Sequence, residues 1–188
     1  MIMPALDEML QRVALISDLV GKAPTGFGRT ALMKCLYFLQ TVRRVPLGYH
    51  FRLYTYGPFD PDVLTDLSLA ERLGAVGSEL QRFSGGYRYE LGRGTGGGRL
   101  SEGARDFLDR YQDDIDWVVE VFAGRSALEL ENASTLVFTD RSVSERGERV
   151  TLHELVRKVH EVKPRLATHV IEKEARRLME HRLIAATQ

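Results

Sequence analysis

The sequence predicts an α+β fold that is mainly helical, with a winged-helix-like N-terminal half containing a small β hairpin and a helical C-terminal half. Apolar residues recur at steps of three and four through most of the 188 residues, which is the spacing of amphipathic helices. Two short extended runs meet around Ser84, Gly85 and Gly86, a pattern typical of a hairpin. We therefore expect a winged-helix-like region over 1–98 and a helical region over 99–188, packed together as one compact unit.

The first half is expected to hold three helices and one strand before the hairpin. Asp60 is placed to cap the third helix and Pro61 to occupy its first turn, where proline is tolerated. Gly57 and Pro58 are expected to end the strand. The expected elements are helices over 5–20, 29–43 and 61–74 and a strand over 49–56.

The second half opens with the glycine-rich run 92–98, which we expect to be a flexible wing or linker. The run matches GxGxxG, but the strand before it is short and polar, and the next helix is expected to start only at Ser101. A dinucleotide site needs a buried parallel strand and a helix directly after the glycines, so nucleotide binding is not favoured. Four helices are expected here, over 101–123, 126–141, 152–162 and 168–183.

Composition excludes several classes of protein. The 26 basic and 26 acidic side chains give a formal net charge of zero, unlike a disordered tail or a polybasic nucleic-acid coat. Residues 1–100 carry 12 basic and 9 acidic side chains, a mildly basic bias that permits nucleic-acid contact without demanding it. The single cysteine, Cys35, and the absence of an apolar leader or an 18-residue apolar run predict a reduced, cytoplasmic protein with no membrane contact.

The sequence favours a protein that is not an enzyme and that has no cofactor and no metal site. It contains none of the common nucleophile, P-loop, zinc-protease or paired-cysteine motifs. His153 and His160 are seven residues apart on one expected helix, about 10 Å along its axis, which is too far for one ion. The acidic residues near Asp113 are expected to form a solvated helix face.

The aromatic strand leaves two interpretations open. Tyr49, Phe51 and Leu53 alternate with a second set, His50, Arg52 and Tyr54, so the two sets lie on opposite faces. The second face could stack on bases or grip a peptide, or the segment could simply be a half-buried strand with amphipathic tyrosines.

The run Leu32–Gln40, the segment Tyr49–Phe59 ending in Tyr56-Gly57-Pro58, the following helix and the turn at Leu73-Gly74 together resemble the bacterial YwgA-like family. They also resemble the wider Panacea domain group of hyperpromiscuous antitoxins, and the similarity covers about residues 25–80. The resemblance implies a non-enzymatic bacterial protein that binds a partner protein, such as a toxin or a subunit of a phage-defence or mobile-element system.

Two function classes follow. The first is a protein-interaction module, antitoxin-like or an accessory subunit, whose expected partner-binding residues are Lys34, Tyr37, Arg52, Tyr54 and Tyr56. Lys34 and Tyr37 share a helix face, which we expect to meet the Tyr56-Gly57-Pro58 turn. The helix expected over 101–123 offers Phe107, Tyr111 and Trp117 as further anchors.

The second class is a winged-helix regulator that binds DNA through its wing. Its expected nucleic-acid-binding residues are Arg82, Arg88, Arg93 and Arg99. The acids of the helix over 61–74 make it a poor recognition helix beside a phosphate backbone. A homodimer is compatible with either class.

Overall fold

A computed structural model describes residues 4–83 and 86–187, which divide into two compact units. Unit 1 holds residues 4–50 together with Asp60–Arg125, and unit 2 holds Phe51–Phe59 together with residues 126–187. The α+β, mainly helical class is confirmed. Among the described residues, no helix is both long enough and apolar enough to cross a bilayer.

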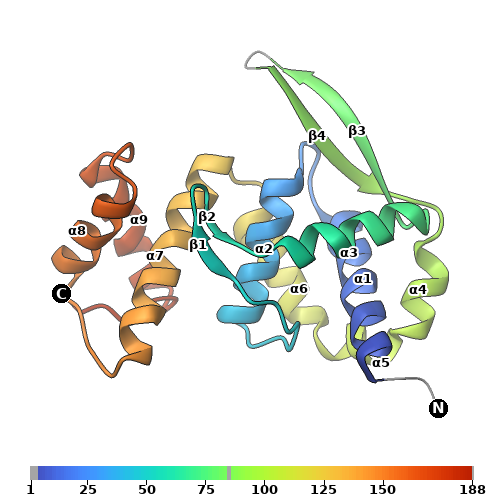
Figure 1. Ribbon diagram of the computed structural model, residues 1–188, viewed down its shortest axis with the longest axis horizontal. Helices are drawn as coiled ribbons and strands as arrows, with labels where there is room; N and C mark the ends of the chain where they lie inside the picture. Colours follow the sequence, from blue (N-terminus) through green and yellow to red (C-terminus); the bar gives the residue numbers. More distant parts are fainter. Residues whose placement is uncertain (1–3, 84–85, 188) are drawn as a thin grey trace. The chain divides into compact units, whose positions relative to one another are not determined.

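Unit 1 contains three helices, then a long two-stranded hairpin, then short helical segments (Figure 1). Its elements are α1 (Pro4–Lys22), α2 (Arg29–Thr41), α3 (Pro61–Arg72), β3 (Val76–Phe83), β4 (Gly86–Arg93), α4 (Gly97–Gly103), α5 (Arg105–Arg110), α6 (Gln112–Val118) and the π-helical turn η1 (Val119–Ala123). Unit 2 contains β1 (Arg52–Tyr54), β2 (Gly57–Phe59), α7 (Ala127–Glu145), α8 (Leu152–Val162) and α9 (Thr168–Glu180).

The core of unit 1 is built on the apolar faces of α1 and α2. Leu15 and Ile16 of α1 and Leu36 of α2 are fully buried. Phe122 of η1 stacks on Phe38 of α2 with ring centroids 3.8 Å apart, which fixes the last helical turn of the unit onto α2.

A polar cluster joins α1, α3 and the segment after α2 inside unit 1. Asp66 accepts hydrogen bonds from Arg12 Nε at 2.6 Å and from the Tyr49 hydroxyl at 2.9 Å. Burial raises the pKa of Tyr49 above its ordinary value, and the neighbouring Asp66 carboxylate raises it further, so Tyr49 stays a neutral donor. The predicted start of α3 is confirmed, because Asp60 accepts from the Asp62 amide at 2.9 Å.

The expected strand over 49–56 is shorter than predicted, and it is one half of a hairpin. Gly57 and Pro58 do not end it: they pair with Tyr54 and Leu53 as strand β2. Gly57 has φ +86°, a conformation that suits glycine, and this lets the chain reverse over Thr55 and Tyr56.

The long hairpin of β3 and β4 is confirmed, and it projects from the helices of unit 1 (Figure 1). The predicted joining residues Ser84 and Gly85 lie outside the described part of the chain. The base of β4 is held by the loop before α2. There the Leu91 amide donates to Phe27 O at 2.8 Å, and the Gly26 amide donates to Glu90 Oε1 at 2.7 Å.

The glycine-rich run 92–98 is packed against the turn between α3 and β3 instead of forming an open linker. A Cβ added at Gly94 would lie 2.1 Å from Gly74 O, and one added at Gly96 would lie 2.2 Å from Leu73 O. The glycines are therefore needed for close backbone approach. The next helix, α4, begins at Gly97, and Ser101 lies inside it.

The single helix expected over 101–123 is broken into α4, α5, α6 and η1. Ala104 and Tyr111 leave the helical conformation, with φ near −116° and −110° and ψ near +18° and +16°. The breaks turn successive short segments so that Leu108 and Ile115 are both buried in the same unit.

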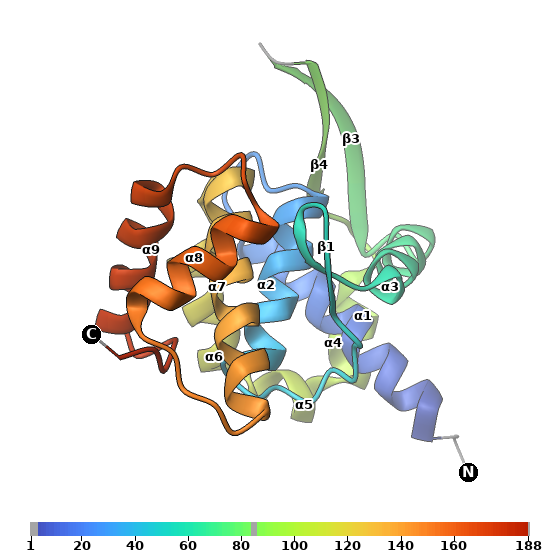
Figure 2. The same cartoon turned by 60° about the vertical axis from the view of Figure 1, so that its left-hand side comes forward.

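Unit 2 is a cluster of three helices with the β1–β2 hairpin, and α8 and α9 lie beside α7 (Figure 2). Ser126 and Glu129 form a capping box at the start of α7, as Thr151 and Glu154 do for α8. The Ala185 amide donates a bifurcated hydrogen bond to both carboxylate oxygens of Asp140 on α7, at 3.1 and 3.0 Å, which fastens the segment after α9.

The boundary expected between residues 98 and 99 does not match this division. Helices α4 to α6 contact α1 and α2 and belong to unit 1, whereas residues 51–59 contact α7 and belong to unit 2. Contacts distant in the sequence, rather than chain order, decide the membership of each unit.

We expect Gly94→Ala and Gly96→Ala each to lower the free energy of unfolding of unit 1 by about 1–3 kcal/mol or more, because the new methyl group meets a backbone carbonyl. Gly98→Ala is the matched control: nothing lies within 4 Å of its added Cβ, and alanine favours a helix. Trp117, the single tryptophan, lies in unit 1, so its fluorescence in a urea titration reports this unit. Equal stability of Gly94→Ala and Gly98→Ala would contradict the packing role.

Candidate functional site

The candidate site is the turn of the β1–β2 hairpin and the loop that follows α8, all within unit 2. Tyr54 pairs with Gly57, so Thr55 and Tyr56 form a two-residue turn. Phe51–Phe59 contains one arginine, Arg52, and no acidic residue. The turn therefore presents aromatic and cationic groups without a compensating carboxylate of its own.

The buried side chain of Lys163 binds the backbone of this turn. Its Nζ donates to Tyr54 O at 2.9 Å and also to Thr55 O, and it lies 3.1 Å from Glu131 Oε1. An ammonium group has three protons, and these three oxygens supply one acceptor for each. The Lys163 side chain is only 4% exposed, so a charged group is buried with all its donors satisfied.

Glu131 of α7 receives a second cation from the same loop. Arg165 Nη2 lies 2.5 Å from both oxygens of the Glu131 carboxylate. The hydrogen bond to Glu131 raises the pKa of Arg165 above its ordinary value. The Glu131 side chain is 5% exposed and that of Arg165 is 46% exposed, so the network runs from the interior to the surface.

Two tyrosines of the β1–β2 hairpin are exposed, and each contacts a neighbouring side chain. Tyr54 is 68% exposed and Tyr56 is 62% exposed. The Tyr54 ring packs against Phe59 with centroids 5.8 Å apart, and the guanidinium carbon of Arg165 lies 4.9 Å from the Tyr56 ring centroid. Each ring is therefore in contact with one neighbouring side chain and remains mostly exposed.

A shallow cavity of about 530 Å³ lies beside these rings. It is lined by Leu53, Tyr54, Thr55, Val162, Lys163, Pro164 and Arg165. Val162 is half exposed although it is apolar, and the following Pro164 is also exposed. We call the exposed group Tyr54, Tyr56, Val162, Pro164 and Arg165 the tyrosine site.

The structure brings together three of the five predicted partner-binding residues. Arg52, Tyr54 and Tyr56 all lie on the β1–β2 hairpin and are exposed, and the predicted alternation along residues 49–54 is confirmed. Lys34 and Tyr37, by contrast, are each 2% exposed on α2, because that helix is buried along most of its length. They offer no open surface to a partner. Their expected meeting with the Tyr56 turn stays a prediction.

The four arginines predicted to bind nucleic acid are all exposed, but they do not form one surface. The register of the long hairpin places Arg82 opposite Tyr87 and Arg88 opposite Gln81, so these two arginines point to different faces. Arg93 lies at the base of β4, with its side chain against Gly21 of α1, and Arg99 lies on α4. They therefore do not gather in one patch, and their expected role in binding nucleic acid stays a prediction.

The two histidines on α8 line a second cavity in unit 2. It has a volume of about 590 Å³, and His153, His160, Glu172 and Arg176 are among its lining residues. His160 Nδ1 lies 2.9 Å from Leu166 O, which gives this histidine a structural bond at the end of α8. Within the described residues, no group of three His, Cys, Asp or Glu side chains is placed to hold a metal ion.

Cys35 lies on α2 and is fully buried. Burial raises the pKa of its thiol well above the ordinary value, which disfavours the reactive thiolate. The expected anchors Phe107, Tyr111 and Trp117 are half-buried, and each packs on another aromatic ring of unit 1.

Sequence reasoning missed Glu131, Lys163 and Arg165. Lys163 attracts notice in the sequence only as the residue before Pro164, and Glu131 only as one acid in a helix. The sequence gives no signal for Glu131: only the structure shows that it lies within Leu130–Val137, which is buried all along its length on α7. An acid inside such a run needs a buried cationic partner.

No protein-family model, no curated protein and no solved structure matches the chain. The resemblance to the YwgA-like family and the Panacea group therefore stays a prediction.

We expect Glu131→Gln to lower the free energy of unfolding of unit 2 by about 3–5 kcal/mol, because it leaves Lys163 buried without its carboxylate. Glu172→Gln is the matched control, since Glu172 pairs with Arg176 on the surface of α9 and such pairs contribute about 0.5 kcal/mol or less. Circular dichroism during urea unfolding gives the stability. Hydrogen exchange of the peptide covering residues 51–59 shows whether the hairpin is released. Equal effects of the two substitutions would refute the role of Glu131.

Proposed function

We propose that the chain is a non-enzymatic protein-interaction module that binds one partner protein through the tyrosine site. The proposal is carried by one observation: a buried network of one carboxylate and two cations supports a surface turn that displays two exposed tyrosines. Tyrosine and arginine are the residue types most often responsible for binding energy at protein interfaces.

The energetics of the network support a positioning role. Removing charges from water costs several kcal/mol per ion, and an apolar replacement of similar volume often gives equal or greater stability. Lys163 donates two of its hydrogen bonds to the carbonyl oxygens of Tyr54 and Thr55, so the network fixes the backbone of the turn itself. A role in presenting that turn accounts for a feature that stability alone does not require.

The supported rings favour binding for a second reason. An interface loses free energy when flexible side chains become ordered on binding, by about 0.5–1.5 kcal/mol for each. Phe59 and Arg165 already hold the Tyr54 and Tyr56 rings, so less of this loss remains. Val162 and Pro164 extend the apolar surface next to the rings.

The charge of the site favours an acidic partner segment. Arg52, Lys163 and Arg165 carry three positive charges against the single carboxylate of Glu131. The Lys163 ammonium also donates hydrogen bonds to the carbonyl oxygens of the turn, so these oxygens already have a donor. We therefore expect side chains, rather than an added β strand, to provide the contacts with the partner. The resemblance found in the sequence supplies the class of partner, a toxin or a defence-system subunit.

We expect the double substitution Tyr54→Ala with Tyr56→Ala to abolish recovery of the partner in a quantitative pull-down from nuclease-treated native cells, because it removes both anchors. Val170→Ala is the control, an apolar side chain of unit 2 that is 41% exposed on α9 and lies outside the tyrosine site. Thermal unfolding of all variants shows that the units remain folded.

A stoichiometric protein lost from the double variant and kept by Val170→Ala supports the proposal. A partner that both variants retain, or the absence of any stoichiometric protein partner with the wild-type chain, overturns it.

A further inference from the structure

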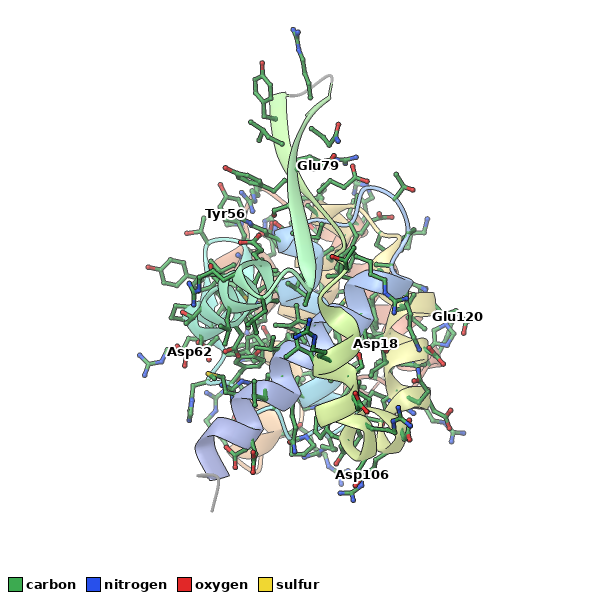
Figure 3. The ribbon with its side chains drawn as sticks, turned by 90° about the vertical axis from the view of Figure 1, so that its right-hand side faces the viewer. Asp18, Tyr56, Asp62, Glu79, Asp106 and Glu120 are labelled. Carbon is green, nitrogen blue, oxygen red and sulfur yellow. The ribbon has the colours of Figure 1, made fainter. Side chains whose placement is uncertain are left out.

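The long hairpin of unit 1 has two chemically different faces. Paired residues of an antiparallel ribbon point to the same side, and alternate residues of a strand point to opposite sides. The register therefore puts Leu80, Arg82, Tyr87 and Tyr89 on one side, and Glu79, Gln81, Arg88 and Glu90 on the other. We call the first set the Leu80–Tyr89 face. Figure 3 shows side chains standing out on both sides of the projecting hairpin, with Glu79 labelled.

Apolar and aromatic groups on the Leu80–Tyr89 face are unusually exposed. Leu80 is 58% exposed, Tyr87 is 67% exposed and Tyr89 is 45% exposed. Lower on the same side of the ribbon, Val76 and Leu91 are buried in unit 1. The Leu80–Tyr89 face therefore continues, along the same side of the hairpin, a surface that is buried near the helices of unit 1.

The two faces also differ in charge. Arg82 is the one charged residue of the Leu80–Tyr89 face, and Arg93 lies on the same side at the base of β4. Both acids of the hairpin, Glu79 and Glu90, lie on the opposite face with Arg88. The guanidinium carbon of Arg29 lies 4.0 Å from the Tyr89 ring centroid. Glu71 of the neighbouring helix α3 is the acid near this contact, with its Oε1 3.6 Å from Arg29 Nη2.

We propose that the Leu80–Tyr89 face binds single-stranded nucleic acid. Tyr87 and Tyr89 are two residues apart on one strand, which places them about 7 Å apart on the same side. An extended strand can put one base on each ring, and aromatic side chains stack on bases of any sequence. Arg29 lies against the Tyr89 ring, yet Tyr89 remains 45% exposed, while Arg82, opposite Tyr87, is placed to meet the adjoining phosphate.

This assignment differs from a duplex-binding wing. Arg82 on the outer part of the face and Arg93 at its base can neutralise only a few phosphates. The affinity of this hairpin for a duplex is therefore expected to be low. Exposed aromatic rings on a β ribbon instead bind unpaired bases by stacking, because the faces of unpaired bases are free. The surface lies in a different unit from the tyrosine site, and this inference does not depend on the proposed function.

The hairpin offers a matched pair of arginines for the test. Fluorescence anisotropy with a short labelled oligothymidylate and a duplex of the same length measures binding at low salt. We expect the single strand to bind more tightly than the duplex. Tyr87→Ala is expected to weaken it by about tenfold or more. Arg82→Ala is expected to weaken it several-fold and to lower the slope of log K against log salt by about 0.7, the value for one phosphate of a single strand.

Arg88→Ala is the control, because Arg88 is also an exposed arginine of the hairpin but lies on the opposite face. We expect it to change the affinity by less than about twofold, a change compatible with the loss of one distant charge. The three side chains are exposed, and thermal unfolding confirms that each variant is folded. Equal losses in Arg82→Ala and Arg88→Ala, tighter binding of the duplex, or no binding of the single strand at low salt each overturn the proposal. Loss of a protein partner in Tyr87→Ala with unchanged oligothymidylate binding would assign the face to a protein and overturn it as well.

Discussion

The carboxylate of Glu131 is the point on which the arrangement of unit 2 depends. It lies on α7 and is shared by two cations of the loop after α8, one buried and one half exposed. Lys163 passes this constraint on to the β1–β2 hairpin through two backbone carbonyls. A buried carboxylate with no cation would be strongly unfavourable, so three segments that are distant in the sequence are held together by the need to neutralise one charge.

Both exposed aromatic surfaces are fastened to their units by buried contacts at their base. In unit 2 the ion network fixes the turn beneath Tyr54 and Tyr56. In unit 1 the long hairpin is fixed at its base by close backbone contacts of Gly94 and Gly96 and by the bond from the Leu91 amide. A surface that is already ordered loses less entropy when a ligand binds, which is why rigid supports accompany exposed anchors.

Local chemistry made much of the fold predictable. Helical spacing located most helices, Asp60 marked the start of α3, and alternation from Tyr49 to Tyr54 identified the exposed side of the short hairpin. What the sequence concealed depends on distance along the chain. Lys163 is 108 residues from Thr55, and Gly94 is required because of Gly74, so no local pattern announces either contact. The same distant contacts move residues 51–59 into unit 2.

The most direct test of this account is the state of the Lys163 ammonium group, observed by proton and nitrogen NMR at neutral pH with Lys173 as the exposed reference. Because its three N–H donors each have an acceptor and the group is buried, Lys163 is expected to show slowly exchanging Nζ protons, and Lys173 is expected to show none. The Lys163 signal is expected to disappear in Glu131→Gln. Rapid exchange at Lys163 in the wild-type protein, like that of Lys173, would contradict the claim that a buried ion pair holds the turn.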